Sequence, residues 1–126
     1  MTLEVLEAAG ISTAGLRSKP WDEFASADAP KMDFVFTVCD QAAGEACPLW
    51  PGQPMTAHWG IEDPAAVGGA EFQQRAAFED ALHFMRNRIA AFINLPVESI
   101  DRLTLNSKLR GIGTMDGSTV RAPQVA

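Results

Sequence analysis

The sequence predicts an α/β domain with a parallel sheet, on three observations. Along its 126 residues the expected elements follow the order helix, strand, loop, strand, long helix, short helix. Residues 33–38 form a nearly unbroken β-branched and aromatic run, which is typical of a strand buried on both faces, as in a parallel sheet. Residues 70–94 carry apolar side chains at steps of three and four, the period of a helix that packs through one face.

Residues 1–9 are expected to form a helix that ends at Gly10. Leu3, Leu6 and Ala9 share one helical face, and a glycine supplies the positive φ at which helices commonly stop. A helix that begins at the first residue has no room for an N-cap. We therefore expect further structure to precede it in the intact fold.

Residues 39–54 are expected to form a long loop after the first predicted strand, and this loop contains both cysteines. Long loops in compact domains are often functional. Residues 55–59 read as a second short strand, and residues 21–24 as one short helical turn in an otherwise polar stretch.

The apolar face predicted for the long helix consists of Phe78, Leu82, Met85, Ile89 and Phe92. A last helix is expected to start with Thr104 as N-cap and to end at Gly111 or Gly113. Residues 1–113 would then form part of a single α/β domain, with residues 114–126 as a disordered tail because they lack periodicity.

Composition narrows the class of protein. The 16 acidic and 10 basic side chains give a net charge of −6, which repels phosphate backbones, so nucleic-acid binding is not expected. No apolar run approaches the roughly 18 residues that span a bilayer, and the N-terminus has no basic region typical of a secretory signal. We expect a cytoplasmic protein without a membrane partner.

The two cysteines, Cys39 and Cys47, lie eight positions apart on the long loop. Cys39 directly follows the first predicted strand, and ligands of open α/β sheets bind at the carboxyl ends of strands. One interpretation is a transient catalytic or sensing pair, since a structural disulfide is disfavoured in a reducing compartment. The other is a buried cysteine acting as a small hydrophobe beside an incidental one.

A zinc site built from Cys39, Cys47, His58 and His83 is disfavoured. Structural zinc sites use closely spaced ligand pairs, whereas these gaps are 8, 11 and 25 positions. We expect His58 and Trp59 to be packing residues. His83 is expected on the surface of the long helix, paired loosely with Glu79 four positions earlier.

Asp63 follows the second predicted strand and precedes Pro64. Proline restricts the residue before it and fixes the turn, so this carboxylate is expected at the same sheet edge as Cys39. It could serve as a general acid, or it could only cap the next segment.

The most specific motifs of the sequence are residues 37–52 (TVCDQAAGEACPLWPG) and 57–65 (AHWGIEDPA), supported by residues 10–19 and by residues 86–89 with 94–96. Together these segments resemble the cysteine-based arsenate reductases built on the low-molecular-weight protein tyrosine phosphatase fold. The resemblance covers roughly residues 2–113.

The resemblance implies a cysteine relay. In that family a nucleophilic cysteine in an N-terminal C-x5-R loop attacks arsenate, a second cysteine releases arsenite, and a third resolves the disulfide. Cys39 would take the second role and Cys47 the third, and Asp63 would be the general acid. No tightly bound cofactor and no metal are implied, and the electron donor would be thioredoxin or another thiol reductant.

The chain departs from that family in one respect: it contains no C-x5-R motif. Six positions after Cys39 is Glu45, and six after Cys47 is Gln53. The expected fold is therefore an incomplete low-molecular-weight phosphatase-like (flavodoxin-like) three-layer parallel sheet without its N-terminal βαβ unit. Because the missing strand is central in the family, the two remaining strands are expected to flank a gap.

The resulting hypothesis is an arsenate reductase-family protein that is truncated and inactive alone, with arsenate as substrate once the N-terminal segment is supplied. One alternative is a non-catalytic remnant or thiol-based binding module that needs a partner chain. Another is a low-molecular-weight protein tyrosine phosphatase relative. An unpaired strand edge also predicts self-association.

Overall fold

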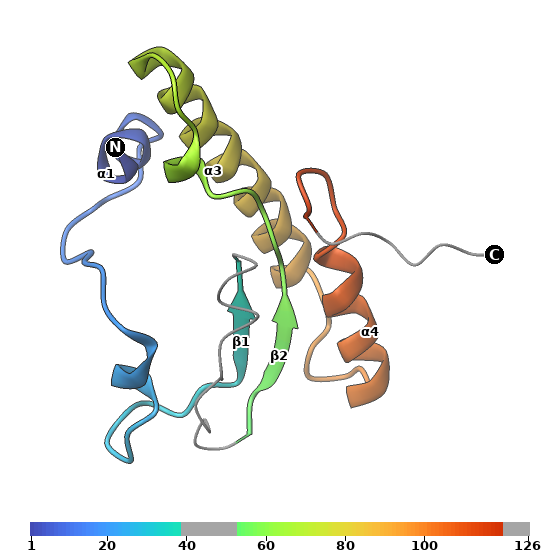
Figure 1. Ribbon diagram of the computed structural model, residues 1–126. Coiled ribbons are helices and arrows are strands. Elements are labelled where there is room, and N and C mark those ends of the chain that lie inside the picture. Colours follow the sequence, from blue (N-terminus) through green and yellow to red (C-terminus); the bar gives the residue numbers. More distant parts are fainter. Residues whose placement is uncertain (39–52, 120–126) are drawn as a thin grey trace.

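The computed structural model describes residues 1–38 and 53–119 (Figure 1). In chain order the elements are α1 (Thr2–Ala8), the 3₁₀ turn η1 (Trp21–Phe24), β1 (Phe34–Thr37), β2 (Met55–His58), the 3₁₀ turn η2 (Pro64–Ala66), α3 (Glu71–Ile93) and α4 (Arg102–Ile112). The expected α/β class is confirmed. Within these described ranges, no helix combines the length and apolarity needed to cross a membrane.

β1 and β2 are direct neighbours in a parallel sheet, with Phe34 opposite Met55. Backbone hydrogen bonds extend the pairing at both ends, from Met55 N–H to the Asp33 carbonyl (3.0 Å) and from Trp59 N–H to the Thr37 carbonyl (2.7 Å). The expectation that the strands would flank a gap is therefore wrong, because each satisfies the other's backbone groups. Among the described residues the sheet has two strands, and the edge of β1 away from β2 pairs with no other strand there.

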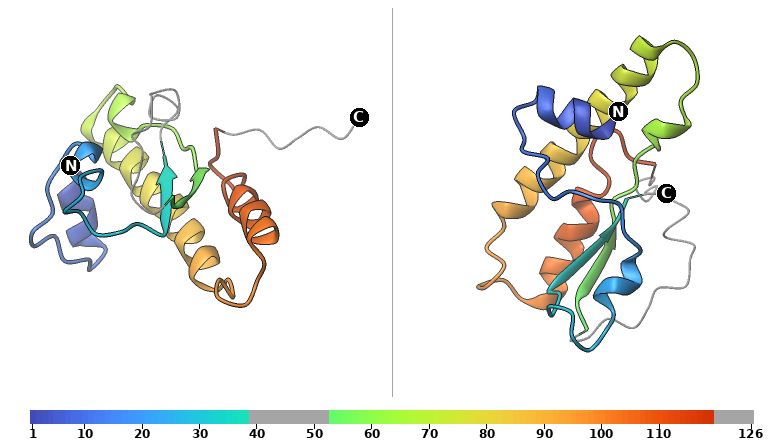
Figure 2. Two further views of the ribbon diagram at one scale, coloured as in Figure 1. Left: turned by 90° about the horizontal axis from the view of Figure 1, so that it is seen from below. Right: turned by 90° about the vertical axis from the view of Figure 1, so that its left-hand side faces the viewer.

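The core lies where this sheet meets α3 and α4. Figure 2 shows both helices on one side of the strands and η1 on the other. Trp59 is 2% exposed, stacks on Phe36 with ring centroids 3.8 Å apart, and donates its indole N–H to the Leu109 carbonyl at 2.9 Å. The buried cluster comprises Ala57, Trp59, Leu105, Leu109 and Ile112.

β1 is half-buried along its whole length, so the expectation that it would be buried on both faces is wrong. Phe34 and Phe36 pack against the core, whereas the intervening Val35 and the final Thr37 point to the other face, as the two-residue period of a strand requires. That second face is only partly covered.

The long helix α3 begins and ends within one residue of the predicted bounds, but one predicted core residue faces outward. Ile89 is 48% exposed, whereas its neighbour Arg88 is completely buried. Arg88 stands three residues after Met85 and four before Phe92, so it occupies the middle of the inward stripe. A core predicted from apolar residues alone leaves Arg88 out, because arginine is rarely buried.

Asp101, and not Thr104, is the N-cap of α4. The Asp101 carboxylate accepts hydrogen bonds from the Thr104 backbone N–H (2.9 Å) and from the Thr104 hydroxyl (2.7 Å). These bonds, the one from the hydroxyl first, lower the pKa of Asp101. Threonine takes the third helical position because aspartate is the better cap three residues earlier. The predicted stop is confirmed, since the C-cap is Gly113.

The stop of α1 is also as predicted. Gly10 has φ of +80°, its N–H bonds the Glu7 carbonyl at 3.0 Å, and the following Ile11 N–H bonds the Leu6 carbonyl at 3.0 Å. This pair of bonds is a Schellman motif, which needs a residue of positive φ at the Gly10 position. α1 then packs against α3 (Figure 1).

The prediction of a disordered tail from residue 114 is wrong for residues 114–119. Residues 114–119 form a turn that returns to the strands: Ser118 makes an antiparallel bridge with Ile61, and Thr119 N–H bonds the Gly60 carbonyl at 3.0 Å. This contact joins segments more than 50 positions apart, which no local periodicity signals. Residues 120–126 lie outside the described residues.

Candidate functional site

The carboxyl ends of β1 and β2 lie together, and the proposed site residues follow them. Ile61 N–H donates to the Val38 carbonyl at 2.9 Å, which ties the segment after β2 to the end of β1. Val38 immediately precedes Cys39, and Ile61 stands two residues before Asp63. Cys39 and Cys47 themselves lie outside the described residues.

Asp63 is the N-cap of η2. Its Oδ1 accepts a hydrogen bond from the Ala65 N–H at 2.9 Å, and its backbone is extended, as expected before Pro64. The capping interpretation is therefore confirmed. It does not compete with acid chemistry, because Oδ2 makes no hydrogen bond to any described residue and the side chain is exposed.

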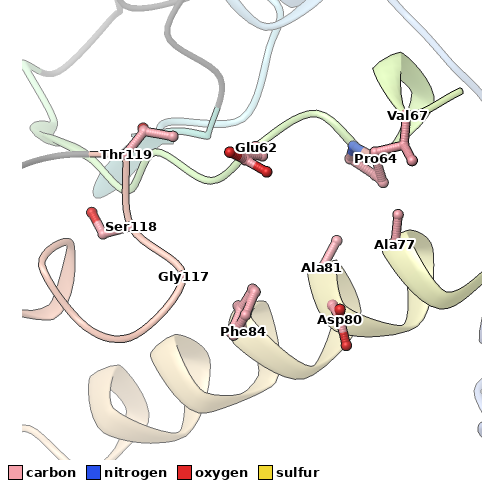
Figure 3. Close-up of a pocket in the computed structure, with 10 residues that line it drawn as sticks. All are labelled: Glu62, Pro64, Val67, Ala77, Asp80, Ala81, Phe84, Gly117, Ser118 and Thr119. Atoms are coloured by element: carbon pink, nitrogen blue, oxygen red, sulfur yellow. The ribbon is translucent and has the colours of Figure 1, made fainter.

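Beside Asp63, its two sequence neighbours line a cavity of about 420 Å³. Figure 3 shows this cavity between the chain that leaves β2, the middle of α3 and the turn at residues 117–119. Glu62 and Asp80 supply carboxylates, Ser118 and Thr119 supply hydroxyls, and the remainder of the lining is small or apolar: Pro64, Val67, Ala77, Ala81, Phe84 and Gly117.

His58, the last residue of β2, is held across the sheet by Thr37. The Thr37 hydroxyl and His58 Nδ1 are 2.7 Å apart. This contact fixes the imidazole beside the carboxyl end of β1. His58 is half-buried within the strand, as expected of a packing residue.

His83 lies apart from this edge, on the exposed surface of α3. Its expected pairing with Glu79 is wrong, because Glu79 bonds Arg75 at 3.1 Å and His83 Nε2 lies 3.4 Å from the Asn87 amide. Three or more metal-binding side chains do not gather anywhere in residues 1–38 or 53–119.

Sequence reasoning missed one residue near the site, Arg88. Its guanidinium bonds the carbonyls of Met115 and Asp116, in the turn whose next residues line the cavity. Its position three residues after Met85 and four before Phe92 is the sequence signal that places it on the buried face of α3.

This arrangement, with two parallel strands packed against α3 and α4, is that of an α/β protein. The sequence matches the family "Low molecular weight phosphotyrosine protein phosphatase" over residues 1–94, about three quarters of its length. The chain belongs to this family, which confirms the resemblance drawn from the motifs at residues 37–52 and 57–65.

Within the family, the chain is similar to proteins named arsenate reductase. It is 37% identical over 62 residues to that of Oceanobacillus iheyensis, which covers 49% of this chain and 44% of the relative. It is 37% identical over 60 residues to that of Bacillus subtilis (48% and 42%), and 41% identical over 44 residues to that of Staphylococcus xylosus (35% and 33%). The matched part of the chain spans less than half the length of each of these relatives.

Proposed function

We propose that this chain carries the relay cysteines and the general acid of an arsenate reductase. The observation that most supports this is the hydrogen bond between Ile61 N–H and the Val38 carbonyl. It joins the segment that leads directly into Cys39 to the segment that leads into Asp63. A thiol and an acid carried on these segments would act on one bound oxyanion.

In the proposed reaction, a thiolate in an oxyanion-binding loop attacks arsenate, and Asp63 protonates the oxygen that leaves as water. Cys39 then attacks the arsenic-bound sulfur. The sulfur–arsenic bond breaks, its electron pair stays on arsenic, and arsenite departs as a disulfide forms. Cys47 attacks that disulfide and forms a new one with Cys39. A dithiol reductant of the thioredoxin class returns both to thiols, so two electrons pass from thiols to arsenic.

The first nucleophile is not among these 126 residues, because no cysteine is followed six positions later by arginine. An oxyanion is best held by backbone N–H groups together with an arginine fork, and such positioning contributes much of the rate. The proposal therefore requires that loop from polypeptide outside this sequence. The chain alone should not turn over arsenate.

The test is arsenate reduction coupled to thioredoxin, thioredoxin reductase and NADPH. It is run on the chain alone and on the chain fused to a strand–loop–helix–strand segment with a C-x5-R loop. Turnover is expected only in the fusion, and Cys39→Ser or Cys47→Ser should abolish multiple turnover. Asp63→Asn should lower kcat by about 10²-fold or more, the usual contribution of a general acid.

A matched control for the acid is Glu98→Gln, a change at an exposed carboxylate between α3 and α4. It should leave kcat unchanged. Robust turnover by the chain alone, or full activity of Asp63→Asn, would contradict the proposal.

A second candidate function, phosphotyrosine hydrolysis, is favoured by the family matched over residues 1–94. It would use Asp63 in the same way but would not need the cysteine pair. Cys47→Ser in the fusion separates the two activities: it should leave p-nitrophenyl phosphate hydrolysis intact and stop arsenate reduction.

A third alternative is a binding module that needs a partner chain. It is favoured by the edge of β1 away from β2, which pairs with no strand among the described residues. A groove of about 320 Å³ lies there, lined chiefly by Trp21, Phe24, Met32, Phe34, Val35 and Val38. An unpaired strand beside apolar side chains is a template for another strand. We infer that the isolated chain pairs β1 with β1 of a second copy about a twofold axis.

A further inference from the structure

Arg88 is the one charged residue among the described residues that is fully buried. Its guanidinium makes three hydrogen bonds, all to backbone carbonyls. Nη1 donates to Phe84 (3.2 Å) and to Asp116 (3.3 Å), and Nη2 donates to Met115 (3.2 Å). Among the described residues, no carboxylate contacts it and Nε has no hydrogen-bond partner.

A buried cation without a carboxylate is expensive, so these carbonyls are what keep the side chain inside. Desolvation lowers the pKa of Arg88, but an arginine remains protonated in proteins. Two of its three acceptors, the carbonyls of Met115 and Asp116, belong to the turn after α4 and lie 27 and 28 positions further along the chain. The guanidinium therefore fastens that turn to α3.

The fastened turn is pressed closely against α3. Gly117 has φ of +88°, and a Cβ added there would lie 2.4 Å from the Phe84 ring. Ser118 closes the turn, with its N–H bonded to the Met115 carbonyl at 3.1 Å and its hydroxyl to the Gly113 carbonyl at 2.6 Å. The turn has little freedom to move while Arg88 holds it.

The same turn holds the chain that leads into Asp63. Ser118 bridges Ile61, and Thr119 N–H bonds the Gly60 carbonyl at 3.0 Å. The N–H of Ile61 is in turn bonded to Val38 at the end of β1. Residues 60–61 are thus clamped between β1 on one side and the turn on the other, two residues before the candidate acid.

We propose that Arg88 is a positioning residue for Asp63: by holding the carbonyls of residues 115 and 116, it fixes the turn that clamps Gly60–Ile61 and so sets where the Asp63 carboxylate projects. The consequence for catalysis rests on the proposed function of Asp63. The mechanical coupling does not, and it is measured separately.

The experiment compares Arg88→Met with Arg86→Met in the full 126-residue chain. Arg86 lies on the exposed side of the same helix, so its change matches the first in charge and helix propensity. Amide hydrogen exchange is followed at Ile61, Thr119 and Ala65, the last of which reports the bond to Asp63 Oδ1. Leu109 in the core serves as an internal reference.

In Arg88→Met, exchange at the first three amides should rise at least about tenfold, the size expected from losing a hydrogen bond to a charged group. Leu109 should be unchanged, and Arg86→Met should resemble the wild type. Arg88→Lys keeps the charge and a donor, so it should restore part of the protection. It also covers the case in which the methionine variant fails to fold.

Equal exchange in the Arg88 and Arg86 variants, or a uniform rise that includes Leu109, would overturn the proposal. In the fusion that carries the oxyanion loop, Arg88→Lys should lower kcat with little change in KM. Enhanced exchange at Ile61 and Ala65 with unchanged kcat would support the mechanical coupling of Arg88 to the segment before Asp63. The same result would count against Asp63 as the acid.

Discussion

Gly113 stands where the end of α4 meets the end of β2, and the structure leaves no room there for a methyl group. A Cβ added at Gly113 would lie 2.6 Å from the His58 carbonyl oxygen, 3.1 Å from Trp59 Cδ1 and 3.2 Å from the Arg110 carbonyl oxygen. Two of these three neighbours are backbone atoms, so the strain cannot be relieved by a side-chain rotation. With φ of −62° the backbone itself would accept alanine, and the effect of Gly113→Ala is purely steric.

Gly111, two residues earlier on the same helix, is the matched control, because a Cβ there meets nothing within 4 Å. Overpacking a buried contact costs about 1–3 kcal/mol, so Gly113→Ala should lower the free energy of unfolding by that amount. Gly111→Ala should raise it by about 0.5–1 kcal/mol, since alanine is the better helix former. The same chemical change is thus expected to have opposite signs at two positions of one helix.

Urea denaturation followed by far-UV circular dichroism and tryptophan fluorescence measures both values at one protein concentration. The midpoint should fall for Gly113→Ala and rise for Gly111→Ala, with similar slopes. Shifts of the same sign, or a Gly113→Ala midpoint equal to that of the wild type, would refute the packing of α4 against the end of β2.

Three further predictions concern the thiols, the strand edge and the cap of α4. Mild oxidation should give an intramolecular Cys39–Cys47 disulfide that thioredoxin reverses, which mass spectrometry of alkylated protein detects; two free thiols or only intermolecular dimers would contradict it. In light scattering after size exclusion, the chain should be larger than a monomer, and Val38→Lys at the groove beside β1 should weaken the association, whereas Leu103→Lys on exposed α4 should not. Asp101→Ala should destabilise α4. Because the pKa of Asp101 is lowered in the folded state, its carboxylate stabilises the fold fully above its unfolded pKa of about 3.9, and this stabilisation is lost as the pH falls through the folded pKa. Urea midpoints of the wild type and the variant, measured over a series of pH values, test this.

What the sequence by itself determined is the local structure. Both strands, the extent of α3 and the stop of α1 at Gly10 follow from signals within a few residues: a β-branched run, a repeat of three and four, and a glycine with positive φ. The motif around Asp63 belongs to this class too, since Pro64 restricts the backbone before it. Short-range sterics and hydrogen bonds decide such features, and they are present in any segment read alone.

Only the tertiary structure decided which segments meet. The direct pairing of β1 with β2, the return of residues 114–119 to Ile61 and the burial of Arg88 each join residues that are 21 to 57 positions apart. Arg88 is the example: from the sequence, a guanidinium on an apolar helix face is expected to be exposed. It is buried because the fold places the carbonyls of Met115 and Asp116 within hydrogen-bonding distance of it. Burial of a charge depends on partners brought by the fold, and no local pattern records them.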